Sequence, residues 1–325
     1  MTSTTCSTPI RNSRSSYESN EQRRSGARGA TPTSTTNIYT AFDDLENCYE
    51  DTSNFGAIIS DLKEQVTSED NWRIHFDAIE SLRVLNKYYP NDIRKYFADL
   101  SVFLQKSMES LRSNLSKNTL MLIREIFESY KHTQSLDEFL KEIVPIILEK
   151  SVSEKSFLKN EARAALKALE KTGCNNNVIQ VLCNKSFDKN GVISELSFQA
   201  LTEVVQQADE NLTENISNDI LEVLFHTIAQ SLDGKRAVNK RVAKGLCEKL
   251  KGLFSQKEKD FERYMRESLK LKETEVQIII EAMKKSPHNT RADFSGFIKT
   301  KKLKQESDKL SNAASFQLIS INLKK

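Results

Sequence analysis

Trp72 is the residue whose type and position bear most directly on chemistry, and it is the only tryptophan in the chain. It follows the polar pair Asp70-Asn71 and heads a stretch of helical periodicity that continues to Leu85. An aromatic residue at the head of a helix, beside a short turn, should be exposed. Because large aromatic rings are frequent binding hot spots, the sequence predicts that Trp72 contacts a partner. The alternative is that Trp72 packs on its own helices.

Catalytic chemistry is not indicated by any motif. The phosphate-binding patterns GxxxxGK[ST] and GxGxxG do not occur, and neither do GxSxG or HExxH. The five cysteines form no CxxC pair and the four histidines are scattered, so no metal-ligand spacing is present. Paired acids such as Glu161 and Glu195 fall on charged helix faces. We therefore expect a binding protein that is not an enzyme and that uses no cofactor or metal.

Composition favours a soluble, helix-rich protein with a substantial core, since 38% of the residues are hydrophobic and 29% are charged. The net charge is only +3, so attraction to an acidic partner would need a local basic patch. No apolar run approaches the length of about 20 residues that a membrane span requires. The absence of an apolar leader segment and the dispersed cysteines favour a cytosolic protein. The basic tails lack interleaved aromatics, which argues against nucleic-acid binding.

Helical periodicity recurs along most of the chain and is interrupted by turn-forming residues such as Pro90-Asn91 and Asp233-Gly234. The expected helices cover residues 55–66, 76–85, 93–104, 115–127, 136–148, 157–169, 178–182, 193–205, 220–232, 238–254, 261–269 and 276–283. Twelve helices make six antiparallel pairs of roughly 35–45 residues, the period of HEAT-type repeats. One pair cannot bury its apolar face alone, so neighbouring pairs must stack. We therefore expect an all-α fold, a HEAT-repeat α-solenoid; the alternative is an irregular all-α globule.

Three segments follow from this pattern. Residues 1–45 form a basic tail rich in Ser and Thr, which we expect to be disordered because it has too few apolar residues to repay ordering. Its arginines make it either a solubilising tail or an electrostatic tether. Residues 46–286 form the repeat domain. Residues 287–325 form a second basic, disordered tail, whose alternating run Phe316–Leu323 could be a docking segment or a frayed end.

Three stretches of the chain carry the motifs of a known family. Leu62–Arg83 combines a short acidic loop, Trp72 and a helix that ends in Leu-Arg; Ser110–Lys117 reads SLRSNLSK, and Phe157–Ala162 reads FLKNEA. In this order and spacing they resemble the first three repeats of a TOG domain, the tubulin-binding HEAT array, and most closely its CLASP and Crescerin branch. The resemblance covers roughly residues 54–253.

The resemblance implies a flat paddle, TOG-like in form, whose intra-repeat turns line one narrow edge that binds tubulin. An aromatic residue of the first turn would pack on tubulin, and cations of later turns would pair with its acidic surface. The matching positions are Trp72 on the first turn, Arg112 and Lys117 on the second, Lys155 and Lys159 on the third, Lys189 on the fourth, and Lys235, Arg236, Lys240 and Arg241 on the fifth.

The fifth turn places its cations at the N-terminal end of a helix, where the macrodipole disfavours positive charge. A partner anion would explain this placement, and a solvated basic face is the alternative. The fourth turn, Lys189–Glu195, departs from the family, because many relatives carry an arginine cluster there. A single array also favours a structural or ciliary microtubule protein over a processive polymerase.

We therefore expect a microtubule- or tubulin-binding protein of the cytoplasm and cytoskeleton, with the cilium or axoneme as a narrower setting. The tails would bind other cytoskeletal or ciliary proteins. The alternative function is a HEAT-repeat scaffold that docks a peptide along a helical face and does not contact tubulin.

Overall fold

A computed structural model describes most of the chain between the two predicted tails. The described residues are 39–49, 55–68, 71–130, 136–171, 175–207, 216–254 and 258–284. Most of the first predicted tail and all of the second, including the run Phe316–Leu323, lie outside these ranges.

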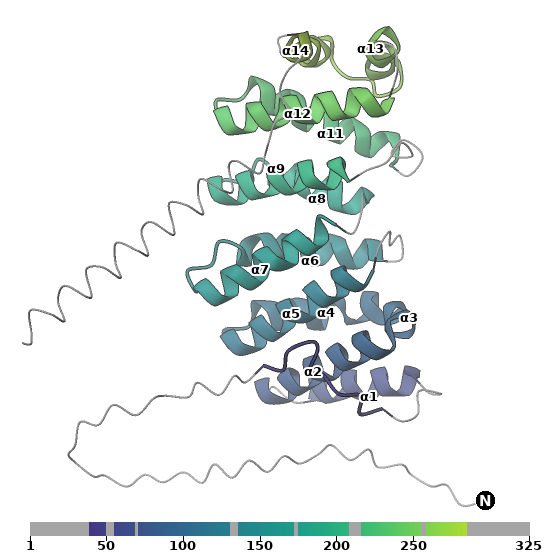
Figure 1. The fold of residues 1–325 in the computed structure, drawn as a ribbon, viewed down its shortest axis with the longest axis vertical. Coiled ribbons are helices and arrows are strands. Elements are labelled where there is room, and N and C mark those ends of the chain that lie inside the picture. The colour runs from purple at the N-terminus through teal and green to yellow at the C-terminus, as the bar shows by residue number, and fades with distance from the viewer. Residues whose placement is uncertain are drawn as a thin grey trace, which may run out of the picture. The chain divides into compact units, whose positions relative to one another are not determined.

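The described residues form helices joined by short connections, with no strand among them (Figure 1). Twelve helices have ten or more residues: α1 (Phe55–Ser68), α2 (Trp72–Tyr88), α4 (Phe97–Glu109), α5 (Ser113–Ser129), α6 (Asp137–Lys150), α7 (Ser156–Leu169), α8 (Asn176–Lys185), α9 (Gly191–Gln206), α11 (Asn218–Asp233), α12 (Ala237–Phe254), α13 (Glu258–Glu267) and α14 (Glu273–Lys284). The short helix α3 (Pro90–Ile93) and the 3-10 turn η1 (Arg94–Tyr96) precede α4. No helix in the described ranges has the length and apolar content to cross a membrane.

The helices pack as a stack of pairs. Within the pairs, α1 packs on α2, α4 on α5, α6 on α7, α8 on α9 and α11 on α12. Between the pairs, the second helices pack in the order α2, α5, α7, α9 and α12, and the first helices in the order α4, α6, α8 and α11. Figure 1 shows the pairs following one another in chain order. The predicted α-solenoid is therefore confirmed, and the irregular globule is wrong.

The sixth pair departs from this alternation. Helix α14 packs against both α11 and α12, whereas the regular pattern would place α13 on α11. His226 of α11 and Glu275 of α14 fix this contact, with Nδ1 and Oε1 2.7 Å apart. Helix α13 reaches α11 through the rings of Phe261 and Phe225, whose centroids are 5.8 Å apart. The last pair thus closes the stack with a packing order of its own.

A buried ion pair joins the first two repeats. Arg83 of α2 and Glu125 of α5 are 0% and 1% exposed, and the guanidinium meets both carboxylate oxygens, with Nη2–Oε1 at 2.6 Å and Nε–Oε2 at 2.9 Å. Arg83 Nη1 also donates to Asn118 Oδ1 at 3.2 Å. Burial raises the pKa of the Glu125 carboxyl, and the hydrogen bond from Arg83 opposes this rise. Both members of the pair are therefore required, because removal of either one would leave the other charge buried without compensation.

The segment 40–49 belongs to the folded unit. The carbonyl of Thr40 accepts a hydrogen bond from Arg83 Nη2 at 2.9 Å, and that of Leu45 accepts one from Lys87 Nζ at 2.9 Å. The Leu45 side chain is 3% exposed. The predicted domain start at residue 46 is therefore too late. Backbone carbonyls of this segment accept hydrogen bonds from the buried Arg83 and the half-buried Lys87, and these bonds hold the segment on α2.

Removing one partner of the buried pair should destabilise the whole stack. We expect Arg83→Ala and Glu125→Ala each to lower the free energy of unfolding by about 3–5 kcal/mol, because each leaves a buried, uncompensated charge. Urea denaturation followed by helical circular dichroism measures this. Lys95→Ala is the control, since Lys95 and Asp92 form an exposed pair, 71% and 51% accessible. Equal stabilities of the Arg83 and Lys95 variants would contradict the assignment.

Two acids on neighbouring repeats create a pH dependence. Burial raises the pKa of the Glu170 carboxyl, at the end of α7, to about 7, and the Glu203 carboxylate on α9 adds to the rise. Because the pKa is higher in the folded chain than in the unfolded one, the stabilising contribution of Glu170 is complete below pH ~4.5 and is lost as the pH rises through about 7.

Glu170→Gln should therefore be more stable than the wild type at pH 8, by on the order of 1 kcal/mol, with the difference shrinking toward pH 5. Thermal unfolding across this pH range measures the effect. Glu154→Gln, at an exposed position in the turn after α6, serves as the control and should show no such pH-dependent gain. A Glu170→Gln variant that tracks the wild type at every pH would refute the assignment.

Candidate functional site

Five turns come together on one edge of the stack, which we call the turn edge. Each turn joins the first helix of a pair to its second helix: the turns end at Asn71, Arg112, Lys155, Asn190 and Arg236, immediately before α2, α5, α7, α9 and α12. Because these second helices pack in sequence, their N-terminal ends follow one another along the same edge. The sequence thus places one equivalent position of each repeat on a shared surface.

Local hydrogen bonds hold these turns. Asn71 Oδ1 accepts from the backbone N–H of Arg73 at 3.0 Å, and Asn190 Oδ1 accepts from that of Val192 at 3.0 Å. Both are side-chain caps, which satisfy free N–H groups at a helix start. Neighbouring turns are also linked, because Lys155 Nζ donates to Ser113 Oγ. The turn edge is therefore defined by local structure as well as by stacking.

Trp72 is the first residue of α2 and is 37% exposed. Its ring also packs edge-on against Phe76 one turn later, with centroids 6.4 Å apart. The expected exposure of Trp72 is confirmed, and the ring also packs on its own helix through Phe76. Its contact with a partner stays a prediction. A ring fixed in this way loses little freedom on binding, which favours its use as a contact.

The predicted cations occupy two kinds of position. Arg112 and Lys155 are exposed N-cap residues of α5 and α7, and Lys189 is exposed one residue before the cap of α9. Lys117 and Lys159 lie about one turn inside α5 and α7 and are half-buried. The structure therefore brings Arg112, Lys155 and Lys189 to the turns, and places Lys117 and Lys159 on the adjoining helix faces.

The fifth turn contributes the densest positive charge. Lys235, Arg236, Lys240 and Arg241 are all exposed, and α12 has no acid in its first turn to offset them. Arg236 Nη1 donates to Ser194 Oγ on the previous repeat at 2.6 Å, so this guanidinium also joins two turns. Cations at a helix N-terminus oppose the macrodipole, and their placement does not serve the helix.

Most of these charges have no acidic partner within the described part of the chain. No ion pair with another residue of the described ranges is formed by Arg112, Lys159, Lys189, Lys235, Lys240 or Arg241. By contrast, Arg83, Arg124 and Arg266 each pair with a glutamate. The positive charge of the turn edge is thus available to an external anion.

The turn edge also has an apolar component, which the sequence motifs do not indicate. Of the eight large hydrophobic side chains exposed among the described residues, six lie at these turns or in the helix turn that follows. They are Trp72 at 37%, Leu111 at 96%, Phe157 at 40%, Phe187 at 48%, Val192 at 49% and Val238 at 46%. The remaining two are Tyr88 and Val102.

Two of these exposed residues correct the predicted apolar stripes. Phe157 and Val238 were expected to begin apolar stripes, but each is the second residue of its helix and is well exposed, at 40% and 46%. The signal that could have identified them is an apolar residue at a helix start, two residues after a cation. The turn edge is consequently a mixed apolar and basic surface.

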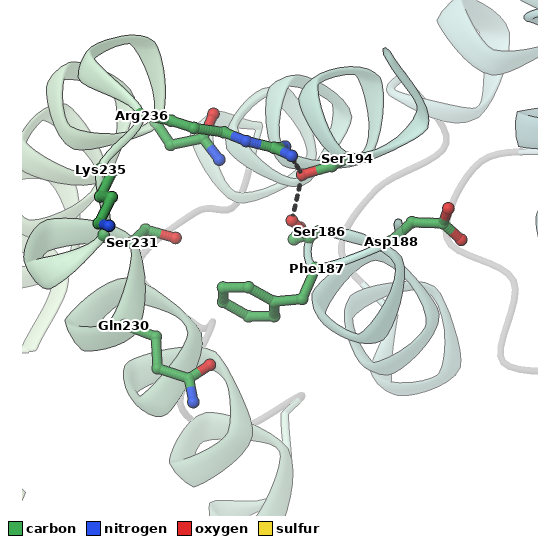
Figure 2. Close-up of a pocket in the computed structure, with 10 residues that line it drawn as sticks. Ser186, Phe187, Asp188, Ser194, Gln230, Ser231, Lys235 and Arg236 are labelled. Carbon is green, nitrogen blue, oxygen red and sulfur yellow. Dashed lines mark hydrogen bonds between the residues drawn. The ribbon is translucent and has the colours of Figure 1, made fainter. Parts of the chain in front are cut away.

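A cleft of about 270 Å³ opens between the fourth and fifth turns (Figure 2). Its lining includes Phe187 and Lys235 at the surface and Ser194 and Ser231 in the interior. The Ser231 Oγ atom has no hydrogen-bond partner among the described residues. The cleft therefore combines an aromatic wall, cations, an unpaired hydroxyl and the carboxylate of Asp188, which pairs with Lys185 at 3.7 Å.

Two of the described cysteines, Cys183 and Cys247, are buried in the core. Burial raises the pKa of both the Cys183 and Cys247 thiols to about 12, so they remain protonated at neutral pH and act as small core residues. No group of three or more His, Cys, Asp or Glu residues in the described ranges is arranged to hold a metal ion.

The fold and the edge define a class of protein: a TOG-like HEAT-repeat array with its intra-repeat turns on one side. A family model, CLASP N terminal, matches residues 54–234, which is more than half of the chain. The chain therefore belongs to the CLASP N-terminal family. The match begins just before α1 and ends at Gly234, the first residue after α11, so it covers the first four turns. The fifth-turn cations Lys235, Arg236, Lys240 and Arg241 follow the matched segment. A search of curated proteins finds no significant match.

Charge reversal at the fifth turn separates a structural role from a binding role. Lys235→Glu combined with Lys240→Glu should leave the free energy of unfolding unchanged or raise it by about 0.3–1 kcal/mol, because acids are favourable at a helix N-terminus. Lys284→Glu is the opposite control, since Lys284 lies in the last turn of α14, where a cation is favourable. Thermal unfolding measures both. A marked loss of stability in the double variant would mean that these cations serve the fold.

Proposed function

We propose that this chain binds tubulin through the turn edge, as a cytoskeletal microtubule-associated protein. The observation that carries the proposal is the alignment of five turns that each present an exposed side chain suited to contact. These side chains are Trp72, Arg112, Lys155, Lys189 and Lys235. Membership of the CLASP N-terminal family supports the choice of tubulin as the partner.

The chemistry of the turn edge matches an acidic protein surface. Its exposed cations lack acidic partners within the described chain, so a binding protein with surface carboxylates would provide those acidic partners. The exposed apolar residues would add burial of apolar area, at about 25 cal/mol per Å². Trp72 would be the strongest single contact, because buried tryptophans at the centre of an interface are typically worth about 2 kcal/mol or more. We propose non-covalent binding and expect no catalytic activity.

The proposal places the protein at microtubules in the cytoplasm, and an axonemal lattice is the narrower ciliary form of the same function. The weakly basic fourth turn favours a second candidate, a HEAT-repeat scaffold that binds another protein through the same apolar residues. Lys189 is the only cation of the fourth turn. Phe187 on the same turn and Leu111 on the second turn are exposed apolar residues of the kind that protein partners bury. Direct binding to microtubules separates the two functions.

The test is co-sedimentation of the full chain with microtubules, with the wild type beside Trp72→Glu. We expect the variant to bind about 30-fold more weakly or worse, since a charge replaces a ring that would be buried against the partner. Val102→Glu is the matched control, because Val102 is 58% exposed in the middle of α4, away from the turn edge. Circular dichroism should show unchanged helical content in both variants.

Salt provides the second arm of this experiment. Binding should weaken as salt rises, because the exposed cations are screened over about 8 Å at physiological ionic strength. The double variant Lys235→Glu, Lys240→Glu should bind more weakly and respond less to salt. Wild-type binding that is insensitive to a tenfold change in salt would rule out a basic contact. A wild type that does not sediment with microtubules would leave the scaffold as the function.

A further inference from the structure

Phe187 and its surroundings are the least expected part of the turn edge. Phe187 lies in the turn between α8 and α9 and is 48% exposed, more than Trp72. Figure 2 shows its ring reaching from the fourth turn toward the end of α11, at the cleft between the fourth and fifth turns. The fourth turn therefore presents an exposed aromatic ring two residues before its cation, Lys189.

Two valines extend this apolar area. Val192 is the second residue of α9 and is 49% exposed, and Val238 is the second residue of α12 and is 46% exposed. Since α9 packs on α12, the N-terminal ends of these helices are neighbours. With Phe187, three of the six exposed apolar residues of the turn edge belong to its last two turns. An apolar area of this kind, bordered by polar residues, is a mark of a protein contact.

An unpaired hydroxyl lies behind Phe187. Ser231 is only 4% exposed, and its Oγ atom has no hydrogen-bond partner in the described ranges. Its hydroxyl is directed toward the side of the cleft on which Phe187 lies (Figure 2). Buried polar groups are nearly always hydrogen-bonded, so a partner group that enters the cleft would remove this deficit.

We propose that Phe187 is a second aromatic anchor of the turn edge, and that the cleft behind it receives a carboxylate-bearing side chain of tubulin. This inference rests on the proposed tubulin binding. It adds that the fourth and fifth turns contact tubulin through apolar side chains as well as through cations. The partner patch is apolar at its centre, to cover Phe187, and acidic at its border, to meet Lys189 and Lys235. One of its carboxylate oxygens accepts the hydrogen bond that Ser231 can donate.

The spacing of the two anchors suits a single partner. Trp72 begins α2, and Phe187 lies just before α9. These two helices are separated by three packing steps: α2 to α5, α5 to α7 and α7 to α9. At 8–10 Å for each step, the anchors lie roughly 25–30 Å apart. A typical interface buries about 800 Å² on each partner, which corresponds to a patch of similar width. One tubulin surface can therefore contact both rings.

The test uses the full chain and microtubules, with affinities from co-sedimentation isotherms. Phe187→Ala should weaken binding tenfold or more, and Phe187→Leu should restore most of the affinity, because it retains an apolar side chain. Val102→Ala is the control and should bind as the wild type does, since Val102 is exposed away from the turn edge.

Ser231→Ala tests the cleft itself. We expect binding three- to tenfold weaker while the thermal midpoint stays the same or rises, because the hydroxyl has no partner to lose in the folded chain. A purely structural role would leave the affinity unchanged.

The outcomes separate the two proposals. If the wild type binds, Trp72→Glu abolishes binding and Phe187→Ala binds as the wild type does, the second anchor is wrong and the tubulin-binding edge stands. If the wild type does not bind microtubules, both proposals fail together. If Phe187→Ala loses helical content, Phe187→Leu and Ser231→Ala decide the question, and unchanged affinity in both would overturn the second anchor.

Discussion

The stacking of second helix on second helix is the constraint on which the rest of the structure depends. A single helix pair cannot bury its apolar face, so α2, α5, α7, α9 and α12 must lie side by side. This arrangement fixes the N-terminal ends of all five helices on one edge, whatever residues the turns contain. The turns are therefore free to carry exposed rings and cations, because the core does not depend on their side chains. The surface proposed for binding is therefore largely separate from the buried core of each repeat.

Polar contacts fix the register between repeats, which apolar packing alone would leave less specific. Arg83 and Glu125 pair at a separation of 42 residues, and Arg236 and Ser194 bond at the same separation three repeats along. The first contact is deep in the stack and the second is at the turn edge. A shift of one repeat against its neighbour would leave a buried charge unpaired in the first case and open the turn edge in the second. Such contacts hold the turns of neighbouring repeats in a fixed position relative to one another.

Much of the fold could be predicted because helical periodicity depends on local sequence. All twelve expected helices correspond to helices of the structure. The exposed position of Trp72 follows from the turn before it, which Asn71 caps. Contacts between distant residues could not be predicted in this way. Arg83 looks like a surface residue and is buried only because Glu125, 42 residues later, meets it. The exposure of Phe187 and the packing of α14 on α11 likewise depend on neighbouring repeats, which a single helix pattern does not reveal.

The central claim is that the turn edge, and no other face, contacts tubulin. Hydrogen–deuterium exchange of the full chain with and without tubulin tests it most directly, because each turn can be followed separately. If the turn edge binds tubulin, we expect protection at residues 69–72, 110–113, 151–156, 186–192 and 234–238. We expect no change at the opposite connections, such as residues 89–96 and 170–175. Protection at the opposite connections, or equal exchange everywhere in a complex that forms, would contradict the account.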